Sequence, residues 1–207
     1  IQEIEAISKV TRENGIILHS DCIATAGIIP LEVEKLGIDC LSFTAQQMYG
    51  PKGAAALYLK KGTKLRPLLL GGVQERGRRA GTENVACIAG FGKACQIAKT
   101  EMKENFKEIK RIRDLLISNI TEKIPNVILN GHPEKRLPGN AHFSFEYIEG
   151  ESITLLLNSQ GIAVASGSSC ASQALKTSHV LNAINLPPAI ANGSILFSLG
   201  KYNSEEE

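Results

Sequence analysis

Over residues 1–90 the chain alternates short apolar runs with segments of helical periodicity, and this alternation limits the folds open to it. The apolar runs that predict strands cover residues 16–19, 38–43, 53–59 and 65–70. An opening helix is predicted by apolar residues at helical spacing before Gly15, a typical helix C-terminal residue, and a short helix is predicted over 30–36. Helices that alternate with short buried strands predict an α/β layer with a largely parallel sheet.

A long amphipathic helix is predicted next. Apolar side chains recur at spacings of three and four from Val85 to Ile120, and Pro125 ends the pattern. Thr82 or Asn84 can cap its beginning. The helix also carries Cys87 and Cys95, which fall on its apolar face and are expected in the core.

The remainder mixes strands and helices in a way that is typical of a small α+β unit. Strands are predicted over residues 127–129, 141–145, 161–165 and 195–199, and a helix over 151–158. We therefore expect two domains, residues 1–100 and residues 101–207. The chain begins within a helical pattern and stops at what resembles a helix start, so we expect it to be part of a longer protein.

Composition excludes several classes of function. The net charge is only +2, with 23 basic and 21 acidic residues interleaved, which argues against direct binding of nucleic acid. No apolar run is long enough to predict a membrane span, so no membrane partner is expected. The five cysteines are an odd number without CxxC spacing, which favours a reducing, cytoplasmic location over a disulfide framework.

Cys170 is the cysteine most open to chemistry. It lies among small residues, Ser166-Gly167-Ser168-Ser169-Cys170-Ala171-Ser172, directly after an apolar run. A loop of this kind can present a nucleophilic or sulfur-carrying thiol beside a rigid scaffold. An incidental thiol in a solvated loop is the alternative.

Two other segments carry polar groups suited to a cofactor. Asp21 follows a predicted strand at the sheet edge where α/β proteins bind ligands, and its carboxylate can pair with a protonated ring nitrogen. Residues 71–82 combine glycines, arginines and a hydroxyl before a helix start, which suits a phosphate. A helix cap or a solvated turn is the alternative for each.

These segments, in this order, resemble the cysteine desulfurases, which are pyridoxal-phosphate enzymes of the class V aminotransferase group. The resemblance covers essentially the whole chain. Its motifs are His-Ser-Asp at 19–21, Tyr-Gly-Pro-Lys-Gly at 49–53, Glu-Arg-Gly-x-Arg-x-Gly-Thr at 75–82, Ser-Gly-Ser-x-Cys at 166–170, Ser-His-Val-Leu at 178–181 and Leu-Gly-x-Tyr-Asn at 199–203. It implies the C-terminal part of a fold type I protein, with part of the large cofactor-binding α/β domain in residues 1–100 and a small α+β domain in 101–207.

The resemblance implies roles for four residues that match the family pattern. Asp21 pairs with the pyridinium nitrogen, and Thr44 stands where the family places a serine on the cofactor phosphate. Thr82 reaches the phosphate of the partner subunit's cofactor, which implies a homodimer. Cys170 is the nucleophile that takes sulfur from L-cysteine as a persulfide.

The chain departs from the family at four other positions. Gln47 replaces the Schiff-base lysine and Gln46 the histidine before it, and an amide can neither form an imine nor shuttle a proton. Ala24 replaces a glutamine that contacts the cofactor ring. Leu196 stands where an arginine clamps the substrate carboxylate.

The resemblance implies a cysteine desulfurase of iron–sulfur cluster assembly, which converts L-cysteine to alanine and passes the sulfur of Cys170 to a scaffold or other acceptor protein. Its cofactor is pyridoxal 5′-phosphate, held noncovalently because Gln47 cannot bond to it. The departures leave open a non-catalytic homologue that acts as an assembly platform. In that reading Cys170 accepts sulfur made elsewhere or ligates a nascent, transient iron–sulfur cluster.

Overall fold

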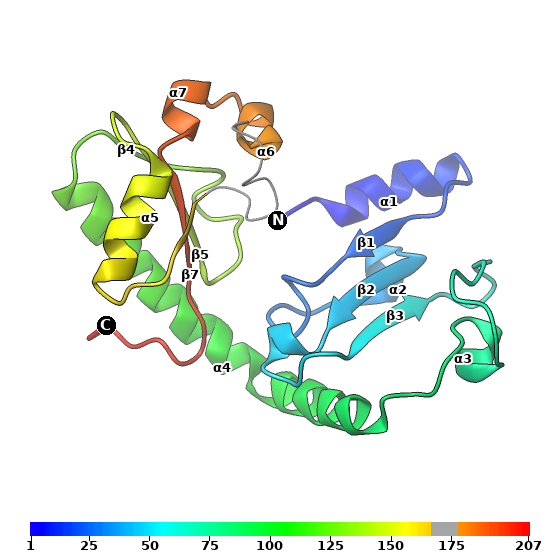
Figure 1. The fold of residues 1–207 in the computed structure, drawn as a ribbon. Coiled ribbons are helices and arrows are strands. Elements are labelled where there is room, and N and C mark those ends of the chain that lie inside the picture. Colours follow the sequence, from blue (N-terminus) through cyan, green and yellow to red (C-terminus); the bar gives the residue numbers. More distant parts are fainter. Residues whose placement is uncertain (167–177) are drawn as a thin grey trace. The chain divides into compact units, whose positions relative to one another are not determined.

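The computed structural model describes residues 1–166 and 178–207, and it divides the chain into two units (Figure 1). The first unit comprises Gln2–Lys103, and the second comprises Glu104–Glu207 together with Ile1. Each unit has its own sheet, and the long helix α4 (Val85–Lys123) contributes residues to both.

The first unit is built on a three-stranded sheet of order β1-β2-β3. Its elements in chain order are α1 (Ile4–Glu13), β1 (His19–Asp21), α2 (Val33–Leu36), β2 (Cys40–Thr44), the 3-10 helix η1 (Gln46–Met48), β3 (Ala55–Leu59) and α3 (Gln74–Gly77). Strands β1 and β2 are parallel, with Asp21 opposite Ser42, and β3 is antiparallel to β2. Both parallel strands therefore end at the same edge of the sheet.

One predicted strand of this unit is wrong. Residues 65–70 form no strand, although three of the expected runs overlap β1, β2 and β3. The leucines of this run remain at the surface, and Leu68 is 93% exposed. Pro67 lacks the N–H that a strand interior needs, which is the physical reason the run does not pair.

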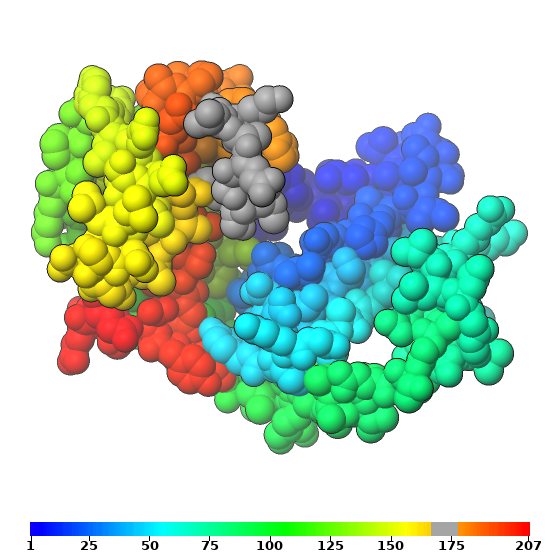
Figure 2. Space-filling view, in the orientation of Figure 1, coloured from blue at the N-terminus to red at the C-terminus, as the bar shows by residue number. Residues whose placement is uncertain are grey.

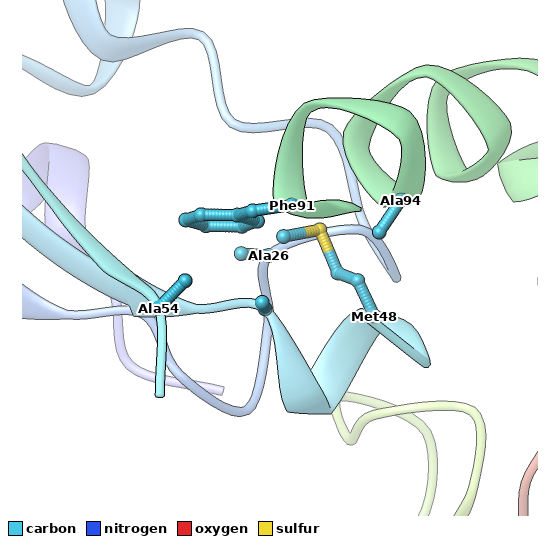
Figure 3. Packing of buried hydrophobic residues seen from close by; sticks show 6 residues of the cluster. Ala26, Met48, Ala54, Phe91 and Ala94 are labelled. Atoms are coloured by element: carbon cyan, nitrogen blue, oxygen red, sulfur yellow. The ribbon is translucent and has the colours of Figure 1, made fainter. Parts of the chain in front are cut away.

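The core of the first unit joins the sheet and η1 to the first turns of α4. Met48 and Phe91 point toward each other within a cluster that also contains small buried alanines (Figure 3). Phe43 of β2 meets Phe91 edge-to-face at 5.4 Å between ring centroids. Gly90 gives α4 the room to approach, because a Cβ at this position would lie 2.8 Å from the Cγ of Pro51.

The helix α4 confirms the long amphipathic prediction. Asn84 caps it, since its Oδ1 accepts the backbone N–H of Cys87 at 3.3 Å. Cys87 and Cys95 are partly buried and pack against the core cluster, as expected. None of the helices within residues 1–166 and 178–207 has the length and apolarity needed to cross a lipid bilayer.

The second unit contains an antiparallel four-stranded sheet of order β4-β5-β7-β6. Its elements after α4 are β4 (Val127–Leu129), β5 (Asn140–Phe145), α5 (Gly150–Ser159), β6 (Ala165–Ser166), α6 (His179–Ala183), α7 (Pro188–Ala191) and β7 (Ser194–Ser198). Phe143 and Ile195 are opposite each other in β5 and β7 and are completely buried. Side chains on this face of the sheet form its core.

The strand expected over residues 161–165 is wrong for most of its length. The strand β6 is Ala165–Ser166, and Ile162 is 46% exposed. Gly161 has a φ of +80°, and its N–H bonds to the carbonyl of Asn158, so the residue ends α5 instead of starting a strand.

Candidate active-site edge of the first sheet

Asp21 and Thr44 lie together at one edge of the first sheet. Each is the last residue of its strand, and because β1 and β2 are parallel, both strands end on the same side. Asp21 is opposite Ser42 in the ladder, and Thr44 follows Ser42 by two residues, so all three lie on the same face. This is the edge at which open α/β sheets place their ligands.

Asp21 is exposed, and its carboxylate is only partly engaged. Its Oδ1 accepts the N–H of Ile23 at 2.9 Å, which begins the turn after β1. The Cys22 N–H donates to the carbonyl of Ser42 at 2.9 Å and fixes that turn to β2. Within residues 1–166 and 178–207 Oδ2 accepts no hydrogen bond, so one carboxylate oxygen of Asp21 is available to a ligand.

Thr44 presents a buried hydroxyl without a partner. Its Oγ1 has no contact with solvent and makes no hydrogen bond among the described residues, a state it shares only with Asn130 Oδ1 there. Leaving a buried polar group unsatisfied costs about 1–3 kcal/mol. A ligand oxygen that accepts from this hydroxyl removes that cost, so the position fits a phosphate group.

Gln46 and Gln47 follow Thr44 directly in η1, and both side chains are exposed. The turn is held by Ala45, which is completely buried and whose carbonyl accepts the N–H of Gly50 at 2.9 Å. Ala24 is exposed in the turn after β1 and has no polar side-chain group. None of these three residues supplies an amine for covalent attachment of a cofactor.

His19 joins this edge, and the sequence analysis did not single it out. Its Nε2 lies 3.2 Å from Ser42 Oγ, across from β1 to β2. The signal that could have found it is the strand period of two, since His19 precedes Asp21 by two residues and so shares its face. The pair His19–Ser42 therefore borders the carboxylate of Asp21 on the sheet.

Thr82 is exposed in the loop before α4, and no hydrogen bond among the described residues joins it to Asp21 or Thr44. The preceding segment is irregular, because Glu75 and Arg76 adopt positive φ values of 49° and 59°. Gln74 Oε1 accepts the N–H of Gly81 at 3.2 Å and closes this segment on itself. The expected phosphate loop is thus a structured, solvent-facing turn.

Cys170 lies in residues 167–177, outside the described part of the chain. The other four cysteines are free thiols, and burial raises the pKa of Cys40 and of Cys95. A raised pKa keeps these two thiols protonated and unreactive at neutral pH. The described residues hold no cluster of three metal-ligating side chains.

Leu196 is half-buried in β7 of the second unit. It lies opposite His142 in β5 and Ala165 in β6, so the three share one face of the sheet. Burial lowers the pKa of His142, and the positive charge of Arg136 lowers it further. The neighbourhood of Leu196 therefore favours uncharged groups.

Arg136 belongs to a buried polar cluster that the sequence analysis also missed. Its guanidinium donates to the carbonyls of Asn130 at 2.7 Å, His132 at 2.9 Å and Asn140 at 3.4 Å. Asn130 Nδ2 in turn donates to Ser144 Oγ at 2.9 Å. Burial lowers the pKa of Arg136, and no carboxylate pairs with it among the described residues, so backbone carbonyls alone hold it in place.

Comparison with known proteins places these features in a family. The model of the family described as "Aminotransferase class-V" matches residues 1–207. "Cysteine desulfurase IscS" of Dictyoglomus turgidum is 48% identical over 207 residues, which cover 100% of this chain and 52% of that protein. "Cysteine desulfurase NifS" of Azotobacter vinelandii is 44% identical over 204 residues, 99% of this chain and 51% of the relative.

Solved structures agree. The X-ray structure of a NifS-like protein from Rickettsia africae matches with a TM-score of 0.90 and 30% identity, over 100% of this chain and 54% of that one. A second structure, titled "NIFS-LIKE PROTEIN", matches with a TM-score of 0.88 and 37% identity, over 100% of this chain and 53% of that one. The chain thus spans about half the length of the proteins it matches.

The mixed α/β architecture and the polar edge of the first sheet are those of a pyridoxal-phosphate protein of fold type I, which confirms the expected fold class. The chain belongs to the aminotransferase class-V family. The curated relatives it resembles within that family are named cysteine desulfurases, so the resemblance seen in the sequence is confirmed.

Proposed function

We propose that the chain is part of a cysteine desulfurase-type protein of iron–sulfur cluster assembly, which forms or carries a persulfide on Cys170. One observation carries the proposal: Asp21, with a free carboxylate oxygen, and Thr44, with an orphaned buried hydroxyl, end two parallel neighbouring strands. The same edge lies in a chain that is 48% identical over its full length to a protein named cysteine desulfurase.

The residues at this edge fit pyridoxal 5′-phosphate as a noncovalent ligand. Asp21 would hold the ring nitrogen protonated through Oδ2, and Thr44 would donate its hydroxyl to the phosphate. Thr82 would contact the phosphate of the cofactor in a partner subunit. When bound, the cofactor supplies an electron sink for bonds at the α-carbon of an amino acid.

Cys170 supplies the sulfur chemistry in this proposal. Its thiolate attacks the sulfur of L-cysteine, the carbon–sulfur bond of the substrate breaks, and alanine leaves with a proton in place of sulfur. The product is a persulfide on Cys170, which a thiolate of a scaffold or other acceptor protein then takes. The proposed location is the cytoplasm, where free thiols such as those of the described cysteines persist.

A second candidate is a non-catalytic assembly platform, and Gln47 favours it. The exposed amide of Gln47 replaces an amine, and Leu196 offers no charge to a substrate carboxylate. In this version Cys170 accepts sulfur released elsewhere or ligates a transient iron–sulfur cluster through its thiolate.

The surface of the first unit supports the proposal of a homodimer. Leu68, Leu70 and Val73 are 93%, 81% and 86% exposed, in the cyan-green segment that leads to α3 (Figure 2). An apolar surface of this kind marks an interface. In the proposed arrangement residues 1–100 form part of the large cofactor-binding domain and residues 101–207 the small domain.

The deciding experiment compares the chain with its Gln47→Lys variant. Both are incubated with pyridoxal 5′-phosphate, reduced with borohydride and weighed by mass spectrometry, and both are assayed for alanine and sulfide from L-cysteine. We expect no covalent adduct on the unmodified chain and a stable adduct on Gln47→Lys. Alanine from the unmodified chain would establish the desulfurase and exclude the platform.

Cys170→Ala is the matched control for this assay. It removes the sulfur acceptor and leaves Asp21, Thr44 and position 47 unchanged, so cofactor binding is expected to persist while persulfide formation is lost. Activity confined to Gln47→Lys would support the platform. Absence of cofactor binding in every variant would contradict both candidates.

A further inference from the structure

The charges around the Asp21–Thr44 edge are unusually few. Residues 20–31 contain the end of β1 and the turn after it, and residues 40–51 contain β2 and η1; together they carry one charged side chain, Asp21. His19 borders this set, and its Nε2 is occupied by Ser42. The edge thus presents a carboxylate and exposed amides, with no cation from η1.

We propose that this edge selects the amine form of the cofactor, pyridoxamine 5′-phosphate, over the aldehyde form, through Gln47. The inference rests on the proposed function, because it takes the cofactor site at Asp21 and Thr44 as given. Oε1 of Gln47 accepts a hydrogen bond from the aminomethyl group of the ligand, and the binding is noncovalent.

The selection follows from donors and acceptors. An aminomethyl group has a pKa near that of lysine, about 10, so at neutral pH it is a cation with three N–H donors and no acceptor. It supplies the positive charge that η1 lacks, and its hydrogen bond to an amide oxygen is charge-assisted. The aldehyde offers only a neutral acceptor, and with glutamine at position 47 it gains no covalent bond.

This preference bears on the two candidate functions. The amine form has no carbonyl group to which the amino group of L-cysteine can add. A protein loaded in this way would carry sulfur that another protein had released, which is the role of the platform.

The test is calorimetric titration of the full chain in an amine-free buffer with three phosphate esters. Pyridoxamine 5′-phosphate, pyridoxal 5′-phosphate and pyridoxine 5′-phosphate share ring and phosphate and differ only in one substituent. We expect the amine to bind about tenfold more tightly than the neutral alcohol or more, as a charge-assisted bond implies. We expect Gln47→Leu to abolish this difference and to leave the affinity for pyridoxine 5′-phosphate unchanged.

The outcomes separate the inference from the function beneath it. Equal affinity for the three esters, or tighter binding of the aldehyde, overturns the inference and leaves the cofactor site standing. Failure of all three to bind overturns the site as well. Gln46→Leu is the matched control from the same turn: a loss of selectivity there, with Gln47→Leu unaffected, overturns the assignment to Gln47. Retained binding of pyridoxine 5′-phosphate shows that each variant is folded.

Discussion

Thr44 ends β2 with a hydroxyl that neither water nor protein satisfies in the described structure. Such a group destabilises the chain alone and favours a complex in which an acceptor meets it. Folding stability and ligand affinity therefore pull in opposite directions at this one atom.

The variant Thr44→Val separates these two effects. Valine keeps the β-branched shape and removes the hydroxyl, so we expect the free energy of unfolding of the ligand-free chain to rise by about 1–3 kcal/mol. The affinity for pyridoxine 5′-phosphate should fall at the same time. Urea unfolding and calorimetry measure the two quantities. Thr44→Ser retains the hydroxyl and should retain the affinity, and a Thr44→Val chain that binds as well as the original would refute the phosphate role.

At the level of single residues, the sequence identified Asp21, Thr44 and Gln47 through their motifs, and the structure adds what no motif contains. Whether the hydroxyl of Thr44 is buried depends on its tertiary surroundings. The contact between His19 and Ser42 depends on strand register, which pairs residues 23 positions apart. Such facts arise from folding and are absent from local sequence.

The packing of α4 on the turn after η1 is fixed by one glycine. Alanine is the better helix former, and at an unobstructed position it gains about 1 kcal/mol over glycine. At Gly90 the added Cβ would lie 2.8 Å from Pro51 Cγ and 3.1 Å from its Cδ, so the helix or the turn must shift. Gly92 lies one half-turn further on and has no atom within 4 Å of such a Cβ.

We therefore expect opposite signs for the two alanine variants. Gly90→Ala should lower the free energy of unfolding by about 1–3 kcal/mol through overpacking, and Gly92→Ala should raise it by about 1 kcal/mol. Urea unfolding measures both. Two variants with the same stability would show that α4 does not rest on Pro51.

For whole elements, prediction succeeded where the sequence period is long and failed in short apolar runs. The stripe from Val85 to Ile120 spans many turns, so chance agreement is small and α4 emerged correctly. Residues 65–70 and 161–165 are apolar as well, yet the first contains Pro67 and the second begins at the helix terminator Gly161. Whether such a run pairs depends on a partner strand that local sequence does not reveal.

At the scale of the whole molecule, the exposed leucines before α3 give a test of the proposed homodimer. We expect Leu68→Asp/Leu70→Asp to raise the dissociation constant of the dimer about a hundredfold or more, because each buried leucine contributes about 1.5–3 kcal/mol. Analytical ultracentrifugation over a concentration series measures it.

Leu155→Asp is the matched control, since Leu155 is 66% exposed on α5 in the other unit and should leave the dimer intact. A wild-type chain that sediments as a monomer at every concentration, or a control that dissociates as readily as the double variant, would contradict this interface.

The 39 residues of α4 pass without interruption through the boundary between Lys103 and Glu104. The two units are thus joined by a stretch of hydrogen-bonded backbone where many proteins have a loose tether. Dividing the gene at this boundary would sever a helix in mid-length, and each fragment would acquire a frayed terminus with up to four unbonded amides or carbonyls. Separate expression of either half therefore calls for fragments that overlap along this rod.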